Sequence, residues 1–199
     1  LLSFKMEISG PTVLQDAKDS WRSRRDAGGG CLYDFASHAI DLVNHLIGLP
    51  DKVSGTILQP IHSMHVEDAM CTTYSYKNGL WGSLMVNWSD ASYRKPTYRL
   101  EVFGKKGKII ADMHSYKIFL RQKPDLDGFS EGWNERHITD FAEPVRFYLR
   151  GYEFTRQLDH FIDRIEGRCP YAACSFVDAL KTDEVIARIR QNAQEERQG

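Results

Sequence analysis

The feature that most constrains the fold is an alternation of apolar and polar residues between Asp51 and Gln122. A period of two is typical of half-buried strands, whose successive side chains point to opposite faces of a sheet. Asn78-Gly79 interrupts the alternation and predicts a type I′ hairpin, a turn that needs two residues with positive φ. We therefore expect an antiparallel meander of about five or six strands, preceded by a strand near the N-terminus. The candidate strands are residues 1–8, 53–61, 69–76, 80–89, 98–102, 108–113 and 116–122.

Residues 28–48 form a second organising stretch, in which three glycines precede an amphipathic helix and a further glycine follows it. Its apolar residues recur at the i, i+3, i+4, i+7 spacing of a buried helical face. Asp34, His38, Asp41 and His45 make a second stripe along the same helix. Two carboxylates and two imidazoles on a rigid helix suit acid–base chemistry, but a solvated polar face has the same pattern.

The C-terminal part predicts two packing helices, over residues 154–165 and 175–189, with Ser175 as the N-cap of the second. Residues 122–151 show no clear period and contain several glycines and prolines, which indicates a long loop. Together these patterns predict an α+β fold: an open, mainly antiparallel β-sheet with helices packed on one face.

Composition excludes several classes of protein. The 199 residues are 42% hydrophobic and suffice for one domain with its own core. The 26 Lys and Arg balance 27 Asp and Glu, so we expect no nucleic-acid partner and no membrane anchor. Cys31, Cys71, Cys169 and Cys174 form no CxxC pair, which is typical of reduced cysteines and indicates a cytoplasmic protein.

The spacing Gly-Gly-Gly-x-x-x-Asp-x-x-x-His-x-x-Asp resembles the substrate-domain signature of the Gfo/Idh/MocA oxidoreductases. The resemblance places Asp34 and His38 on the family's catalytic aspartate and histidine, and Asp41 on its second acidic position. It implies that His38 takes the hydroxyl proton of a sugar or polyol while a hydride passes to NAD or NADP. Asp34 would orient and tune that imidazole. Ala36 stands where the family often has glycine, and outside the signature the resemblance is loose.

The cofactor domain of that family is not expected in this chain. No GxGxxG fingerprint occurs, and Arg94-Lys95-Pro96 lacks the carboxylate of the family's Glu-Lys-Pro motif. The sequence opens directly on a predicted strand, so we expect residues 1–199 to be a single substrate-binding and oligomerisation domain, without its N-terminal Rossmann domain. Alone, it should hold no cofactor and be inactive. The alternative is a non-catalytic dimerisation or carbohydrate-binding module with the same fold.

Further candidate ligand residues lie near strand ends. Trp88, Tyr93 and Arg94 are candidate substrate contacts, since sugars stack on aromatic faces, with a core Trp and a surface Tyr as the alternative. Arg22, Arg24 and Arg25 either meet an anionic group or are paired or solvated. The cluster His62, His65, Glu67, Asp68 and Cys71 has the residue types of a zinc site, but its spacing favours a polar loop, and no metal site is predicted.

Several expected strands carry apolar residues in both alternating sets, so both sheet faces are partly apolar. Trp81 and Met85, for example, oppose Leu84 and Val86. The expected helices suffice to cover one face only. We therefore expect a homo-oligomer, a dimer in which the exposed sheet faces meet.

Overall fold

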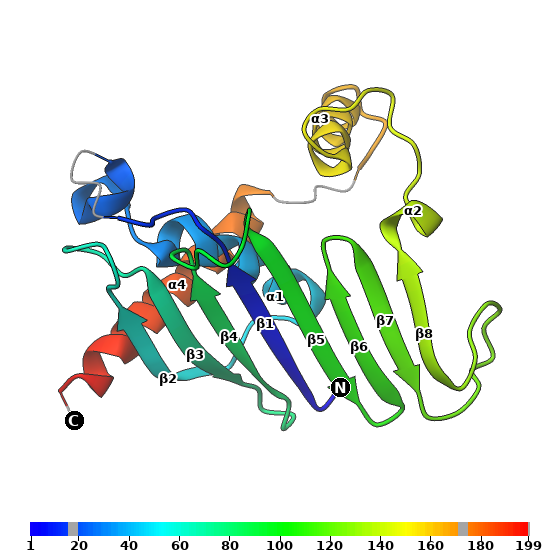
Figure 1. Cartoon of the computed structure of the whole chain (residues 1–199), viewed down its shortest axis with the longest axis horizontal. Helices are drawn as coiled ribbons and strands as arrows, with labels where there is room; N and C mark the ends of the chain where they lie inside the picture. Colours follow the sequence, from blue (N-terminus) through cyan, green and yellow to red (C-terminus); the bar gives the residue numbers. More distant parts are fainter. Residues whose placement is uncertain (16–19, 171–174, 199) are drawn as a thin grey trace.

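The computed structural model describes residues 1–15, 20–170 and 175–198; Asp16, Asp19 and Cys174, which fall in the intervening segments, lie outside the described residues. Its centre is an eight-stranded sheet with the order β2-β3-β4-β1-β5-β6-β7-β8 (Figure 1). The strands are β1 (Ser3–Ser9), β2 (Lys52–Gln59), β3 (Ala69–Ser75), β4 (Trp81–Asn87), β5 (Thr97–Gly104), β6 (Gly107–Asp112), β7 (Ser115–Leu120) and β8 (Gly132–His137).

The first strand lies in the middle of the sheet. β1 pairs with β4 in parallel and with β5 antiparallel, and every other neighbouring pair is antiparallel. The predicted α+β class, with an open and mainly antiparallel sheet, is confirmed. The expected number of strands was too low, because β8 was not foreseen.

Residues 122–151 are not one long loop, and that expectation was wrong. They contain β8 and the short helix α2 (Ile138–Phe141). β8 pairs with β7 from Leu120↔Gly132 to Ser115↔His137 and is an edge strand of the sheet that the described residues form. No helix covers either face of β8, and polar residues lie on both faces. The strand therefore lacks the apolar–polar alternation of a half-buried strand.

The hairpin between β3 and β4 is correctly placed, but its turn type was wrong. Tyr76 and Leu80 pair at the base of a three-residue loop, with the Tyr76 amide donating to the Leu80 carbonyl at 3.0 Å. Gly79 has a φ of 84°, whereas Asn78 does not have a positive φ. Asn78 instead accepts a hydrogen bond from the Leu80 amide through Oδ1 at 3.0 Å. One left-handed glycine is typical of a three-residue hairpin loop.

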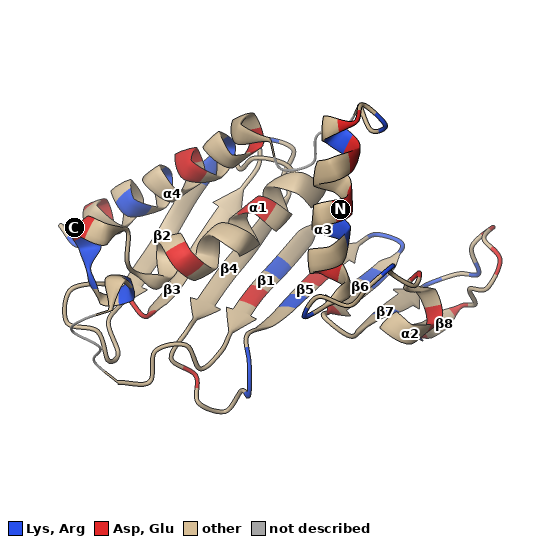
Figure 2. Cartoon of the chain, turned by 90° about the horizontal axis from the view of Figure 1, so that it is seen from above, with Lys and Arg blue, Asp and Glu red and all other residues tan. Residues whose placement is uncertain are grey.

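Two helices cover one half of one sheet face. Figure 2 shows α1 (Ser37–Leu46) and α4 (Phe176–Glu196) side by side over β1 to β4. The core lies beneath them, where alternate residues of the central strands meet the apolar faces of both helices. Ser175 caps α4 as predicted and forms a capping box with Asp178. The largest buried core residues include Met6, Ile8, Leu32, Ile40, Tyr74, Leu84, Trp88 and Ile189.

The helix α3 (Tyr152–Ile165) was expected to pack on the sheet and does not. Figure 1 shows it standing off the sheet beyond the ends of β5 and β6. Its apolar residues, at the spacing of a helical face, are exposed: Phe154, Leu158, Phe161, Ile162 and Ile165. A helix with such an uncovered apolar stripe has a face suited to a further packing partner.

The loop between β2 and β3 is organised by Asp68, whose side chain is fully buried. Its Oδ2 atom accepts hydrogen bonds from the amides of Ile61, His62 and Ser63 at 2.6–2.7 Å. Its Oδ1 atom accepts from Ser63 Oγ and from Trp88 Nε1, both at 2.6 Å. One carboxylate thereby satisfies three loop amides, a hydroxyl and the indole of a core tryptophan.

Candidate functional site

The helix that carries Asp34 and His38 begins with a π-helical turn, η3 (Leu32–Ala36), which continues directly into α1. Glu67 holds this start in place. Its Oε1 atom accepts a hydrogen bond from the Leu32 amide at 3.1 Å, and its carbonyl accepts from the Cys31 amide at 2.9 Å. Single π-helical turns within α-helices are frequent at functional sites.

The glycine triplet before the helix is required by close backbone packing. A Cβ atom on Gly29 would lie 2.3 Å from the Arg22 carbonyl oxygen and 2.6 Å from that of Trp21. Gly28 has a φ of 77° but open space around its Cα. The two positions therefore need glycine for different reasons, one for space and the other for backbone conformation.

These reasons predict different costs for the two alanine variants. Gly29→Ala is expected to lower the free energy of unfolding by about 2 kcal/mol or more, because backbone atoms must move to admit the methyl group. Gly28→Ala should cost only the strain of the left-handed conformation, about 1–2 kcal/mol. Urea denaturation of both variants measures the difference. Equal losses would show that close packing at Gly29 contributes nothing.

Asp34 forms an ion pair with Arg22, whose Nε atom lies 2.8 Å from Asp34 Oδ2. Arg22 comes from the 3₁₀ turn η1 (Trp21–Ser23), and its guanidinium carbon lies 4.6 Å from the centre of the Trp21 ring. Burial, together with the negative charge of Asp34, raises the pKa of Tyr98 on β5. Asp34 therefore pairs with an arginine and acts electrostatically on a tyrosine, neither of which sequence spacing connects to it.

His38 lies on the same helix, and its side chain is exposed. Within residues 1–15, 20–170 and 175–198, no hydrogen bond joins it to Asp34, whose carboxylate is directed to Arg22. Residues four apart are neighbours in a regular α-helix, but the π turn changes the direction of Asp34 relative to His38. The expectation that Asp34 orients His38 stays a prediction.

The other candidate substrate residues lie in different surroundings. Asp41 faces α4, where its Oδ1 atom lies 3.4 Å from Thr182 Oγ1. Trp88 has an exposed fraction of 0% and donates to Asp68, so this structure gives it the core role that was the alternative to ligand stacking. Tyr93 and Arg94 are exposed on the loop before β5.

The structure thus brings Asp34 and His38 onto one helix and adds Arg22 and Tyr98 as neighbours of Asp34. Tyr98 was identified only as a strand residue, and no local pattern connects it to residue 34. Arg22 was one of three arginines for which pairing and ligand contact both stayed open. Arg22 and Arg24 are ion-paired, with Asp34 and Asp26 respectively.

Within the described part of the chain, no three His, Cys, Asp or Glu side chains are grouped closely enough to hold a metal ion. In the cluster between residues 62 and 71, the Asp68 carboxylate is fully engaged by loop amides and Trp88. Among the helices described, none is both long and apolar enough to cross a lipid bilayer.

Comparison with protein families identifies the class of protein. A model described as the GFO/IDH/MocA C-terminal domain matches residues 1–110, which include the sheet centre, the π turn and α1. The chain belongs to this family. Comparison with curated protein sequences gave no match.

Solved structures with the same fold include several sugar dehydrogenases. Levoglucosan dehydrogenase in complex with NADH and levoglucosan matches 98% of this chain with a TM-score of 0.78 and 21% identity. An oxidoreductase domain protein from Kribbella flavida matches with a TM-score of 0.74 and 22% identity. UDP-N-acetylglucosamine 3-dehydrogenase GnnA from Acidithiobacillus ferrooxidans gives 0.67 and 16%. Each match covers 98% of this chain, which spans 57%, 56% and 55% of those chains, respectively.

Proposed function

We propose that this chain is the substrate-binding and catalytic-base part of an NAD(P)-dependent oxidoreductase that acts on a secondary hydroxyl of a sugar or polyol. His38 would take the hydroxyl proton, and Asp34 would orient the imidazole from the same helix. The observation that carries the proposal is the placement on one helix of an exposed imidazole, His38, and a partly buried carboxylate, Asp34, which is ion-paired with Arg22. Family membership supports it.

The residues present do not fit a dinucleotide site by themselves. Gly29 packs against the Arg22 carbonyl and Gly30 against the Glu67 carboxylate, so these two glycines make no open phosphate-binding loop. A nicotinamide held by a separate domain would accept the hydride. This chain matches 57% of the levoglucosan dehydrogenase chain, and the unmatched remainder of that protein is long enough to contain such a domain. The contribution of this chain would be to bind the sugar and hold the proton acceptor.

Because the nicotinamide would be held by a separate domain, we predict that the 199-residue chain alone has no useful affinity for NADH. Titration calorimetry should give no saturable heat at micromolar concentrations of chain. A longer protein that joins this chain to a nicotinamide-binding domain should bind NADH and reduce NAD or NADP in the presence of a sugar or polyol. Tight NADH binding by the short chain would contradict the proposal, and a longer protein inactive on every sugar would favour the non-catalytic module.

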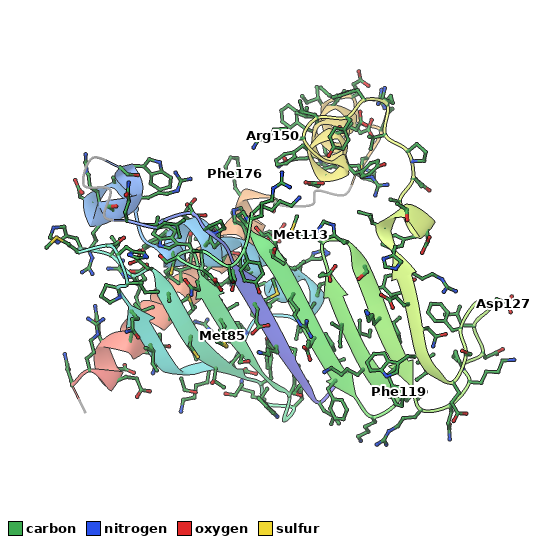
Figure 3. The ribbon with its side chains drawn as sticks, in the orientation of Figure 1. Met85, Met113, Phe119, Asp127, Arg150 and Phe176 are labelled. Atoms are coloured by element: carbon green, nitrogen blue, oxygen red, sulfur yellow. The ribbon has the colours of Figure 1, made fainter. Side chains whose placement is uncertain are left out.

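We also propose a dimer through the sheet face that α1 and α4 leave uncovered. One row across this face contains four aromatic residues, Trp81, Phe103, Phe119 and Trp133, with Ser3 between the first two and Lys108 between Phe103 and Phe119 in the strand register. Figure 3 labels Met85 and Phe119, two residues whose strand positions place them on this face. Lys108 of this row and Arg99 both pair with Glu101, and further ion pairs on the same face connect Lys5 with Glu7 and Lys117 with Glu135. Exposed apolar surface bordered by charge is typical of an interface.

Sedimentation at low micromolar concentration is therefore expected to give about twice the chain mass. Substituting lysine at the exposed Trp81 or Met85 should shift the protein to monomer, because a charge would be buried without a partner. Ile109→Lys is the matched control, since Ile109 is exposed on the opposite face. A monomeric parent chain, or dissociation caused equally by the control, would contradict the dimer.

A further inference from the structure

A cavity of about 240 Å³ lies between α4 and the π turn that begins the catalytic helix. Its walls come from the glycine loop, the end of β2 with the loop that follows it, and the C-terminal half of α4. Neither Asp34 nor His38 lines it. The cavity is therefore separate from the site described above, although both share the same helical turn.

Three arginines line this cavity: Arg25, Arg190 and Arg197. Arg190 donates a hydrogen bond to Tyr33 Oη at 2.7 Å, and Arg197 donates to the Leu58 carbonyl at 3.2 Å. Both partners are uncharged. Within the part of the chain that the structure describes, none of the three forms an ion pair, in contrast to the nearby Arg22 and Arg24.

Among the described residues that line the cavity, Glu67 is the one acidic residue. Its Oε1 atom already accepts the Leu32 amide hydrogen bond that holds the start of the helix. Burial raises the pKa of Glu67, and the positive charges of Arg25 and Arg190 act in the opposite direction. Three guanidinium groups against one carboxylate leave an excess of positive charge around a space that can hold a small anion.

We propose that this cavity binds the phosphate monoester group of a small phosphorylated ligand. A phosphate monoester carries a charge of about −1.5 to −2 near pH 7, which matches the excess of positive charge. Guanidinium groups suit it because their planar N–H donors bind phosphate oxygens in pairs. Leu32, Leu58 and Val66 form an apolar part of the wall, against which the carbon body of such a ligand would pack.

The size of the cavity limits that ligand. Sites for drug-sized molecules usually measure about 300–1,000 Å³, so a cavity of about 240 Å³ takes a phosphate group and a few attached carbons. The inference does not depend on the proposed dehydrogenase activity. Its test uses binding to the 199-residue chain and needs neither cofactor nor sugar.

Calorimetric titration of the chain with inorganic phosphate, at an ionic strength held constant with sodium chloride, is expected to show one site with a Kd of about 1 mM or tighter. Arg190→Gln and Arg25→Gln should each weaken binding about tenfold, because each removes a charged donor. Glu67→Gln should tighten binding several-fold, since it removes the one negative charge and keeps an oxygen for the Leu32 amide.

Arg188→Gln is the matched control. Arg188 lies on α4 two residues before Arg190, does not line the cavity, and donates to the Pro50 carbonyl at 3.0 Å. This variant should bind phosphate as the parent chain does. The proposal is overturned if the parent chain shows no saturable phosphate binding. It is also overturned if Arg188→Gln weakens binding as much as Arg190→Gln, or if Glu67→Gln weakens it, with circular dichroism confirming that each variant is folded.

Discussion

Replacement of His38 by alanine is expected to lower kcat by about 10²-fold or more in an enzyme that joins this chain to a nicotinamide-binding domain. The expectation follows from the role proposed for the imidazole, since a positioned general base typically contributes 10² to 10⁴ in rate. His38 is exposed, so its removal should leave the fold intact. Steady-state kinetics with a sugar or polyol substrate, at several pH values, measures the change.

His45→Ala is the matched control, because His45 is a second exposed histidine on α1. Its kcat should stay within a few-fold of the parent enzyme. Asp34→Asn is expected to lower kcat less than His38→Ala, since it removes the charge beside Arg22 but leaves the base in place. A folded His38→Ala enzyme with nearly normal kcat, or an equal loss in His45→Ala, would remove His38 from the catalytic role.

The second large effect concerns stability. Asp68→Ala is expected to lower the free energy of unfolding by about 3–5 kcal/mol, because buried donors of the loop and of Trp88 lose their acceptor together. That loss is a large fraction of the roughly 5–15 kcal/mol of a typical domain. Asp90→Ala is the control, because Asp90 is less buried and its carboxylate accepts only from Ser92 within the described residues. Urea denaturation of both variants should show a small change for the control, and similar losses would contradict the role of Asp68.

The same carboxylate predicts a pH dependence. Burial opposes ionisation of Asp68, but the hydrogen bonds from Ser63, Trp88 and the loop amides outweigh it and lower the pKa. A carboxylate with a lowered folded-state pKa stabilises the protein above its unfolded pKa of about 3.9. This stability should decline as the pH falls from that value through the folded-state pKa. The decline should be smaller in Asp68→Ala.

Sequence patterns correctly predicted structural features that depend on residues close together in the sequence. The alternation in β3 and β4, the glycine of the hairpin loop and the Ser175 cap are local features, and the structure contains each of them. The central position of β1 depends on pairing with strands far along the chain, so its own residues do not encode it. β8 was missed because an uncovered edge strand has no buried face to reveal it.

In the candidate site, too, the local features were predicted from the sequence and the long-range contacts were not. Helical spacing placed Asp34 and His38 on one helix, and the structure has both there. Helical spacing did not predict the ion pair of Asp34 with Arg22 or the electrostatic effect of Asp34 on Tyr98, because Arg22 lies on a separate turn and Tyr98 on a strand. Trp88 shows the limit of reasoning from position in the sequence. Its place at the end of a strand suggested contact with a ligand, but in the structure its indole is buried in the core and donates a hydrogen bond to Asp68.

Because of the π turn, the position of Asp34 relative to His38 depends on the number of residues in Leu32–Ala36 as well as on their identities. Deletion of Phe35 or Ala36, between Asp34 and His38, would allow a continuous α-helix and rotate Asp34 by about 100° relative to His38. The relative directions of the aspartate and the histidine would change although neither residue had been replaced. In aligning related chains or transplanting this motif into a designed protein, a one-residue gap here should therefore be treated as loss of the site, even where the glycines, aspartate and histidine are all retained.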